Sequence, residues 1–414
     1  MRDLLIRATA ALLGLVLLPT GRAASADAAV PLGAAGLAET RTTKTLADGV
    51  TLTRIVRGAG RASTDEINTT NRGPWVINVL TIDPGETRGH LRATYGPDLA
   101  GTETTTDLVR SSGALAGINA SFFTFSANPE YRGEPVGLGL YDGKLLSEPT
   151  TNPDEADFVV DADTNRVLVG RLGWSGSVRN ERSGATLPLE YLNHPPVVPA
   201  SCAELGDQTA CGAAGDVARF DPEFAAATPS GPGVEVVLDD QGCVVDTFGT
   251  RGRKLADDQT SLQATGRDAA ALLRVAADGC LEETSTLVDE HGDEVPAGGA
   301  LFGVTGRYRL LADGEIAVPP GSGGLYGRNP RTVAGVAEDG RIMLVTIDGR
   351  MATSVGTTLA ETAAVARALG MHDAINLDGG GSATMSVKGD LVNKPCGSRE
   401  RAVGDALVFV NSRY

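Results

Sequence analysis

The stretch that decides the fold reads AINLDGGGSATM and occupies residues 374–385. An apolar run leads into Asp378, three glycines follow, and a second strand-like run covers residues 383–387. Backbone without Cβ atoms can approach a ligand closely, and successive N–H groups can form a concave anion nest. A flexible linker or a plain hairpin turn is the alternative interpretation. Because linkers are not usually wedged between buried strands, we expect a binding turn here.

A helix is predicted immediately upstream, over the sequence TTLAETAAVARALG. Thr358 and Glu361 have the spacing of a capping box, apolar residues recur at helical intervals, and Gly370 is a C-terminal stop. Capping alone explains Glu361, and we also retain it as a catalytic candidate. The local order is therefore helix, buried strand, glycine turn, strand.

Farther out, Asp-Gly pairs recur between β-rich runs, which indicates many antiparallel strands. The first of these pairs, Asp142-Gly143, is expected to turn a hairpin. Two more helices are predicted over TTTDLVRSSG and TGRDAAALLRVAADG. We predict an α+β fold with a mixed, largely antiparallel sheet core, a few packed helices and a single domain.

The N-terminal residues predict export. Residues 1–26 have a basic start, an apolar run too short to span a bilayer and the small-residue site Ala24-Ser25-Ala26, which together are typical of a signal peptide. A retained membrane anchor is the alternative. We expect a flexible lead-in over residues 27–48, an ordered domain over residues 49–414, and a surface excursion over residues 199–233. The protein is then secreted, without stable membrane insertion.

The composition limits partners and cofactors. The formal charge is −16 and no basic tract compensates it, so nucleic acid is not expected as a partner. The chain has four His and five Cys, and no CxxC pair, which argues against zinc; we expect no metal and no cofactor. After export, disulfides are the natural state, with Cys202–Cys211 the expected pair and one cysteine left over. Walker, GxSxG, GxGxxG and HExxH motifs are absent from the sequence. The oligomeric state stays open.

Polar residues at strand ends mark the candidate chemistry. Asn119 follows an apolar run and either binds a ligand or closes a turn. Arg331 begins a β-branched strand, where its guanidinium either forks onto phosphate oxygens or pairs with a surface carboxylate. Asp348 and Asp378 each follow an apolar strand, and two such carboxylates are the usual equipment of glycosidic cleavage. Arg350 lies two places after Asp348.

Several motifs together resemble the phosphodiester glycosidase family. They are GINASFF, PVGLGLYDGKL, RNPRTVAGV, TIDGR, TLAETAAVARALG, NLDGGGSATM and VNKP…RERAV, in the family's order over nearly all of residues 49–412. The chain departs from the family at Ala120-Ser121, where Gly-Gly is more usual, and at Cys396, where Ser is frequent. The first departure argues against a close backbone approach at this point, and the second places the odd cysteine near the site.

The resemblance implies hydrolysis of a sugar-1-phosphodiester at the anomeric carbon. Phosphate is a good leaving group, so hydrogen-bond donors to its charge matter more than a strong general acid. Arg331, Ser382 and the N–H groups of the glycine turn are implied donors, and Asp378 or Asp348 stabilises the cationic sugar or activates water. The implied substrate-binding residues are Asn119, Asn376, Gly379, Gly380, Gly381, Ser382, Arg350 and Arg401; the implied catalytic residues are Asp378, Asp348, Arg331 and Glu361.

Three functions follow as hypotheses. The first is a secreted enzyme acting on phosphodiesters of cell-wall or exopolysaccharide material. The second is a non-catalytic carbohydrate-binding protein of the envelope with the same fold. Such a protein would need aromatic platforms, which are scarce because the chain has two Trp and seven Tyr, and this favours the enzyme. The third is an ordinary glycoside hydrolase, which would need no cationic group beside its carboxylates.

Overall fold

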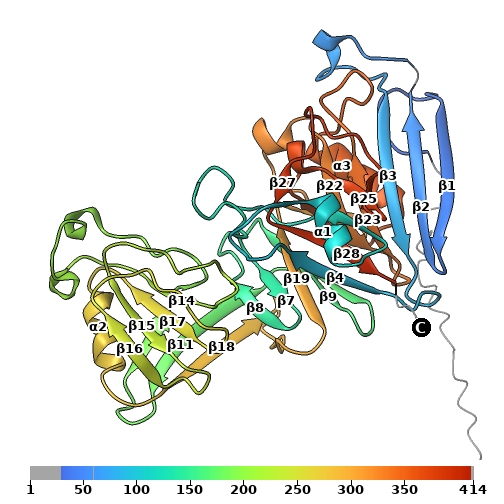
Figure 1. The fold of residues 1–414 in the computed structure, drawn as a ribbon. Coiled ribbons are helices and arrows are strands. Elements are labelled where there is room, and N and C mark those ends of the chain that lie inside the picture. The colour runs from blue at the N-terminus through green and yellow to red at the C-terminus, as the bar shows by residue number, and fades with distance from the viewer. Residues whose placement is uncertain (1–28, 59, 412–414) are drawn as a thin grey trace, which may run out of the picture.

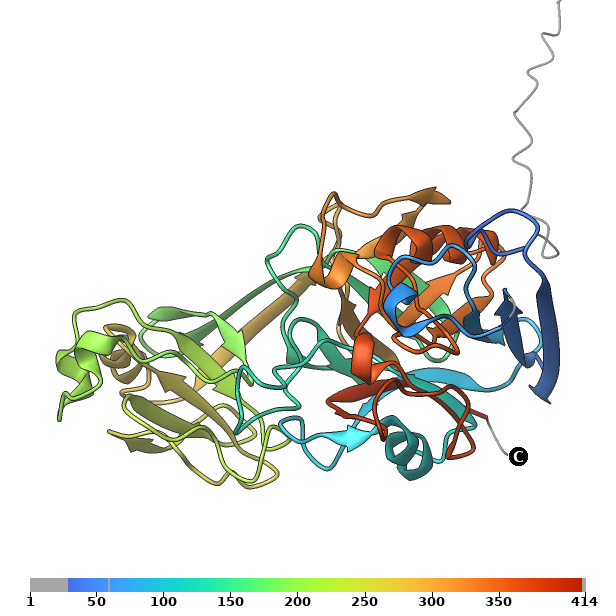
Figure 2. The ribbon, with the colours of Figure 1, turned by 90° about the horizontal axis from the view of Figure 1, so that it is seen from above.

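The computed structural model describes residues 29–58 and 60–411. The predicted signal peptide over residues 1–26 lies outside the described residues. A large body holds both ends of the described chain, and a smaller lobe extends from it (Figures 1 and 2). We call residues 173–288 the small lobe, and the rest the main body. The prediction of one ordered domain over residues 49–414 stays a prediction.

The α+β prediction is wrong, because the protein is mostly β. Strands take up 39% of the residues and helices 10%. All three helical patterns read from the sequence do form helices, but each is at most 10 residues long, whereas apolar runs between tight turns supply strand after strand. Within the described chain the α-helices are α1 (Thr105–Ser111), α2 (Asp268–Val275) and α3 (Leu359–Ala368). The short 3₁₀ helices are η1 (Thr64–Glu66), η2 (Ala200–Cys202), η3 (Gln208–Ala210), η4 (Gly324–Tyr326) and η5 (Gly380–Ser382).

An eight-stranded sheet forms one layer of the main body, and its neighbouring strands pair antiparallel. In spatial order its strands are β1 (Glu39–Ala47), β2 (Val50–Arg57), β3 (Trp75–Ile82), β23 (Ile342–Ile347), β22 (Arg331–Val336), β24 (Asp373–Leu377), β20 (Arg309–Ala312) and β21 (Glu315–Ile316). Helix α3 packs on one face through a cluster that includes Ile77, Val345 and Leu359. The opposite face contributes Leu80, Leu344 and Ile375 to the largest core.

Two five-stranded sheets complete that core. One is β10 (Arg166–Gly170), β9 (Ala156–Asp161), β19 (Leu301–Gly306), β7 (Gly139–Tyr141) and β8 (Lys144–Ser147). The other is β26 (Asp390–Leu391), β25 (Met385–Val387), β6 (Ala116–Asn119), β28 (Asp405–Val410) and β4 (His90–Tyr95). A short pair joins β27 (Ala402–Val403) to β5 (Glu103–Thr104). The predicted hairpin at Asp142-Gly143 is confirmed as the β7–β8 turn, where both residues have positive φ.

The small lobe has two sheets and helix α2. They are β12 (Thr186–Leu189), β11 (Gly173–Asn180), β18 (Leu281–Val288), and β13 (Tyr191–Leu192), β14 (Val217–Phe220), β17 (Thr260–Ala264), β15 (Val234–Leu238), β16 (Val244–Phe248). Strands β11 and β18 lead from this lobe toward β7 and β8 (Figure 1). The aromatic rings of Tyr131 from the body and Phe224 from the lobe pack at a centroid distance of 4.9 Å, so the two parts share a hydrophobic contact.

Two sequence predictions at loops need correction. The predicted flexible lead-in over residues 27–48 contains the nine-residue strand β1, which pairs with β2, and Val30 and Leu32 are fully buried. Apolar and polar residues alternate only weakly in this segment, because β1 is an edge strand and most of its side chains are exposed. The surface excursion over residues 199–233 also contains β14, which is hydrogen-bonded between β13 and β17. Its Cys202–Cys211 disulfide is confirmed; a second disulfide joins Cys243 to Cys280, and Cys396 is free.

Candidate active site

The glycine turn joins two sheets of the main body. Asp378 directly follows β24 of the eight-stranded sheet, and β25 of a five-stranded sheet begins at Met385. Asn119, at the end of β6, ties the junction together. Its Nδ2 donates to Asp378 O at 2.6 Å, and its Oδ1 accepts from Thr332 Oγ1 at 2.8 Å and Thr384 N at 3.0 Å. The turn is therefore held by both sheets rather than being a loose linker.

Glycine is required in the turn for two separate reasons. A Cβ atom on Gly379 would lie 2.7 Å from Pro330 O, which is backbone and cannot give way easily. Gly380 has φ +60°, a conformation that disfavours residues with a side chain. The N–H of Gly380 donates to Pro330 O at 2.9 Å, so this amide serves the fold and not a ligand. The predicted nest of three free amides is therefore incomplete.

The turn lines a cavity of about 280 Å³ that we call the arginine pocket. Its lining residues are Gly324, Leu325, Asn329, Arg331, Arg350, Asp378, Gly379, Gly380, Gly381 and Arg401. Three guanidinium groups and one carboxyl group therefore share a small space. This arrangement favours an anionic ligand, since within the described residues no ion pair involves any of the three arginines.

Arg331 is fully buried and held by carbonyl groups. Its Nε donates to Thr357 O at 3.1 Å, and its Nη2 donates to Leu325 O at 2.7 Å and Gly327 O at 2.6 Å. The Nη1 atom has no hydrogen-bond partner in the described part of the chain. Burial, helped by the charge of Arg350, lowers the pKa of Arg331 to about 10, so the group stays protonated at neutral pH. A buried cation with a spare donor is costly unless an anion meets it.

The other two arginines are less buried. Arg350 donates from Nε and Nη2 to Asn329 Oδ1, at 3.1 and 2.7 Å, and is otherwise exposed. Arg401 donates from Nη1 to Ser382 Oγ at 3.3 Å, and its guanidinium carbon lies 4.9 Å from the centroid of the Phe125 ring. Both groups therefore have a fixed position with donors left over for a ligand.

Asp378 is the carboxylate of the pocket. Burial raises its pKa to about 6, and the charge of Asp405 adds to this; the Ser382 hydroxyl, the Arg401 charge and the Gly379 N–H act in the opposite direction. At neutral pH the group is mostly ionised but holds its proton more readily than an ordinary aspartate. A carboxyl group with a pKa near the working pH is suited to moving protons.

Asp348 does not line the arginine pocket. Both of its carboxylate oxygens accept the N–H of Lys394 at 3.2 Å, and Ser354 Oγ donates to its backbone oxygen at 2.6 Å. The residue is buried, and burial raises its pKa to about 6. The structure thus places Asp348 as an anchor for the loop around Lys394.

Glu361 and Asn376 also have structural partners. The predicted capping box of Thr358 and Glu361 is confirmed, and Glu361 Oε1 accepts from Arg328 Nη2 at 2.8 Å. Asn376 is fully buried and donates from Nδ2 to Arg307 O. Neither lines the arginine pocket. Of the predicted site residues, the pocket lining contains Arg331, Arg350, Asp378, Gly379, Gly380, Gly381 and Arg401. It does not contain Asn119, Asp348, Glu361, Asn376 or Ser382.

Two residues escaped sequence reasoning. Asn329 orients Arg350. Its position directly before the Pro330-Arg331 pair is the sequence feature that could have indicated it. Asp405 is buried beneath the turn and accepts from Ser121 N, Ser121 Oγ and Tyr141 Oη at 2.7, 2.7 and 2.9 Å. A charged residue opening the apolar strand DALVFV is the corresponding signal.

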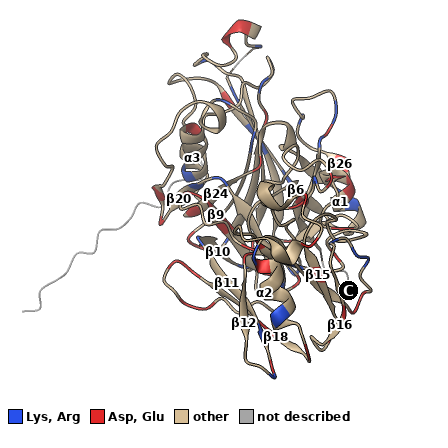
Figure 3. Ribbon diagram, turned by 90° about the vertical axis from the view of Figure 1, so that its left-hand side faces the viewer, with Lys and Arg blue, Asp and Glu red and all other residues tan. Residues whose placement is uncertain are grey.

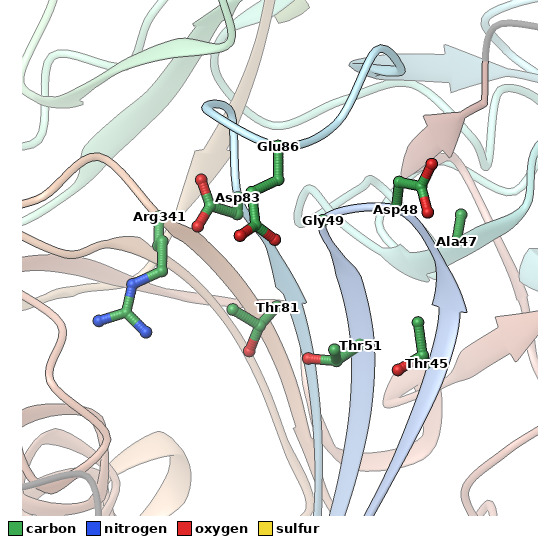
Figure 4. A pocket seen from close by; sticks show the side chains of 9 residues that line it. All are labelled: Thr45, Ala47, Asp48, Gly49, Thr51, Thr81, Asp83, Glu86 and Arg341. Atoms are coloured by element: carbon green, nitrogen blue, oxygen red, sulfur yellow. The ribbon is translucent and has the colours of Figure 1, made fainter.

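A different pocket lies at the far end of the same sheet. It has a volume of about 640 Å³ and presents Asp48, Asp83 and Glu86 near the β2–β3 ends (Figure 4). Arg341 is the basic residue among those lining it. Strand register puts Ile342 opposite Ile82 there, whereas Ile347 and Arg331 pair at the opposite end. This acidic pocket is therefore separate from the arginine pocket and has the wrong charge for a phosphate. In the ribbon of Figure 3, basic and acidic residues are interspersed along the chain.

Comparisons with known proteins bear on the same region. Residues 232–410 match the family model described as phosphodiester glycosidase, and this range contains every residue of the arginine pocket. A curated relative, the SPbeta prophage-derived uncharacterized protein YomE of Bacillus subtilis strain 168, is 36% identical over 82 residues. That match covers 20% of this chain and 13% of the relative.

Two solved structures share the fold, and a third is more distant. A protein of Burkholderia pseudomallei K96243, named as a candidate exported protein, has a TM-score of 0.77 and 28% identity, covering 93% of this chain and 98% of that one. A hypothetical protein from Synechocystis has a TM-score of 0.67 and 21% identity, over 87% of this chain and 62% of that one. The catalytic domain of zebrafish N-acetylglucosamine-1-phosphodiester alpha-N-acetylglucosaminidase aligns over 91% of this chain and 88% of that one, at 14% identity and a TM-score of 0.44, too distant to bear on the site. The predicted resemblance to the phosphodiester glycosidase family is thus confirmed over residues 232–410.

Proposed function

We propose that this protein is a hydrolase that cleaves the sugar C1–O bond of glycosyl-1-phosphodiesters. The observation that carries the proposal is the arginine pocket: the buried guanidinium of Arg331, with its spare Nη1 donor, faces the same cavity as the carboxyl group of Asp378. The family match over residues 232–410 supports the same reaction class. An ordinary glycoside hydrolase has no need of three arginines beside its carboxylate.

The arginines bind the phosphate group. Arg331 supplies a fixed, water-excluded donor, while Arg350 and Arg401 close on the remaining oxygens with paired N–H groups. The positive charge of these arginines lowers the barrier most where it faces negative charge that develops in the transition state. As the C1–O bond breaks, the electron pair moves onto the phosphate oxygen, and the three guanidinium groups stabilise the monoester that leaves. A strong general acid is then unnecessary.

Asp378 acts on the sugar. Its carboxylate stabilises the positive charge that develops at C1 and takes a proton from the water that attacks this carbon. The products are a free sugar and a phosphate monoester, which balances the atoms of the diester and one water. Asp348, Glu361, Asn119 and Asn376 are positioning residues in this scheme, because each makes hydrogen bonds within the fold and none lines the arginine pocket.

The proposed setting is outside the cell. Two disulfides lie in the described chain, which suits an oxidising compartment, and residues 1–26 have the pattern of a signal peptide. The Burkholderia pseudomallei relative is itself named as a candidate exported protein. In the described residues, no helix is both long and apolar enough to cross a membrane. The substrates we propose are sugar phosphodiesters of cell-wall or exopolysaccharide material.

Turnover of a panel of synthetic sugar-1-phosphodiesters tests the function. Release of the free sugar and the phosphate monoester is measured by mass spectrometry for the wild type, Asp378→Asn and Arg331→Lys. We expect Asp378→Asn to lose about a hundredfold in rate, the usual effect of removing one preorganised charge. An uncharged aryl glycoside of the same sugar is the control, on which Arg331→Lys should have little effect.

Two outcomes would reject the proposal. Wild-type turnover in Asp378→Asn would mean that the chemistry is elsewhere. Saturable binding of the panel without any hydrolysis would favour the non-catalytic carbohydrate-binding protein.

A further inference from the structure

A third pocket lies where the small lobe meets the main body. Its volume is about 640 Å³, and its lining includes Thr124, Glu134, Glu148, Trp174, Tyr191 and His194. Strand β11 carries Trp174 and leads from the small lobe toward β7 and β8 (Figure 1). We call this space the interlobe cleft. Its volume is in the range of small-ligand sites in proteins.

The interlobe cleft and the arginine pocket lie on two sides of one loop. Phe125 of this loop packs against Arg401 of the arginine pocket, while the preceding residue, Thr124, lines the cleft. The loop is braced as a hairpin, since Thr124 N donates to Glu134 O and Phe125 N donates to Arg132 O, each at 2.9 Å. A ligand longer than one sugar unit can therefore approach both spaces along the same loop.

Trp174 has the features of a stacking platform. Its indole N–H donates to Ser285 Oγ of the neighbouring strand at 2.9 Å. Its six-membered ring lies over Gly176, where a Cβ atom would come within 2.3 Å of Trp174 Cζ2. The ring is thus fixed by the fold, yet it is only partly buried and lines the cleft. A rigid aromatic face that remains accessible binds apolar ligand faces at little entropic cost.

Glu134 supplies an acceptor that the fold does not use. The residue is 1% exposed, and its Oε1 is hydrogen-bonded to Nδ1 of His194. Its Oε2 has no hydrogen-bond partner within the described residues, although the side chain lines the cleft. Such a buried oxygen is unfavourable unless a ligand or a water donates to it. Glu148 lies beside it, with Oε2 accepting the N–H of Leu192 at 2.8 Å.

The charges of the interlobe cleft favour an uncharged ligand. The lining has three acidic residues, Glu134, Glu148 and Glu190, and two basic ones, Arg171 and His194. Burial raises the pKa of Glu148 to about 7, so this group is only partly ionised at neutral pH. The cleft therefore has a small excess of acidic groups and no large net charge. Unlike the arginine pocket, this cleft has no cluster of spare guanidinium groups that would bind a phosphate.

We propose that the interlobe cleft binds a neutral saccharide unit, which stacks one face on Trp174 and donates a hydroxyl hydrogen bond to Glu134 Oε2. Hydroxyl groups are the neutral donors that a spare carboxylate oxygen needs, and sugar rings combine them with an apolar C–H face. The site stands apart from the proposed hydrolysis, because it needs neither the arginine pocket nor Asp378. If the protein hydrolyses a sugar phosphodiester as proposed, the interlobe cleft would bind a second sugar unit of the same glycan.

Tryptophan fluorescence provides a direct test, because the chain has two tryptophans and Trp75 is fully buried. The full-length protein is titrated with four neutral probes: cellotetraose, chitotetraose, maltotetraose and mannotetraose. We expect at least one probe to give a saturable emission change, with a Kd of about 1 mM or tighter. Isothermal calorimetry on the same probe should show binding about tenfold weaker in Trp174→Ala, and near-wild-type affinity in Trp174→Tyr.

Matched variants keep the result interpretable. Asp378→Asn is expected to bind the probe as the wild type does, so that loss of hydrolysis and loss of cleft binding are distinguished. If Trp174→Ala does not fold, Glu134→Gln replaces it and should also weaken binding about tenfold. Absence of saturable binding for all four probes overturns the proposal, as does unchanged affinity in Trp174→Ala or, in its place, in Glu134→Gln.

Discussion

Asp378 is a residue at which activity and stability oppose each other. Burial raises the pKa of its carboxyl group from 3.8 to about 6, so the folded protein binds this proton more tightly than the unfolded chain does. The resulting stabilisation is fully present below pH 3.8 and is lost as the pH rises through 6. At neutral pH the ionised carboxylate of Asp378 therefore lowers the stability of the folded protein.

We predict that Asp378→Asn is more stable than the wild type at pH 7, although its turnover should be about a hundredfold lower. The asparagine cannot ionise, so the gain in unfolding free energy is about 1 kcal/mol, reduced from the full pKa shift because the side chain is partly exposed. The gain should shrink as the pH falls from 7 to 4. Urea denaturation at both pH values measures it, and a variant that is less stable at pH 7 would contradict this account.

Arg350 allows substrate binding to be tested without disturbing the core. Its side chain is exposed and its hydrogen bonds go to a single acceptor, Asn329 Oδ1. We predict that Arg350→Ala lowers phosphodiester turnover by about tenfold, equivalent to one exposed charge-assisted contact, and leaves the melting temperature unchanged. Arg341→Ala, an exposed arginine at the other end of the sheet, is the matched control and should be silent in both assays. Equal turnover in the two variants would remove Arg350 from the site.

The sequence predicted which strand ends lie together better than it predicted the direction of each side chain. Arg331 pairs with Ile347, and Thr332 pairs with Leu377, so Arg331, Asp348 and Asp378 do lie at one edge. Only two of the three line the arginine pocket. Strand ends can be read from apolar runs, whereas the direction of the first residue after a strand depends on what packs there, here the loop around Lys394.

At the scale of elements, the glycine turn has no room for a side chain at Gly379, because neighbouring backbone lies against it. We predict that Gly379→Ala lowers the free energy of unfolding by about 2 kcal/mol or more, because the new Cβ would lie 2.7 Å from Pro330 O. Since Pro330 adjoins Arg331, the shift should also reduce turnover. Thermal denaturation and kinetics on the purified variant measure both effects.

Gly212→Ala is the control for that substitution. Nothing lies within 4 Å of a Cβ atom built at Gly212, and its φ is not positive. This variant should match the wild type in stability and turnover. A Gly379→Ala protein that behaves like Gly212→Ala would show that the turn tolerates a side chain after all.

The helices and the glycine turn could be predicted because their signals are local. A capping box, an apolar stripe and a glycine stop are read within a dozen residues, and α3 follows them closely. Strand β1 could not be read in this way. Its sequence ETRTTKTLA is polar on both faces because β1 is an edge strand, which pairs with β2 through backbone groups that carry no pattern.

At the scale of the whole molecule, the prediction of the fold class was wrong for a related reason. Counting three helices among strands suggested α+β, but class depends on how much of the chain each element takes up and on what covers the sheets. Here sheets largely cover one another, and the largest core draws residues from strands such as β3, β9 and β28. These are long-range contacts, which no local pattern in the sequence specifies.

The small lobe carries both disulfides, so oxidation should matter more there than in the main body. The Cys243–Cys280 bond closes a loop with a sequence separation of 37, and Cys202–Cys211 one of 9. In the chain-entropy model these loops contribute about 4 and about 3 kcal/mol, respectively.

We predict that Cys243→Ser/Cys280→Ser lowers stability more than Cys202→Ser/Cys211→Ser, and that both double variants lose protection from hydrogen exchange first in residues 173–288. The main body, whose core lies between its own sheets, should keep its protection and the arginine pocket its shape. Hydrogen-exchange mass spectrometry on the two double variants decides this: uniform loss across both parts would mean that the lobe and the body unfold as one unit.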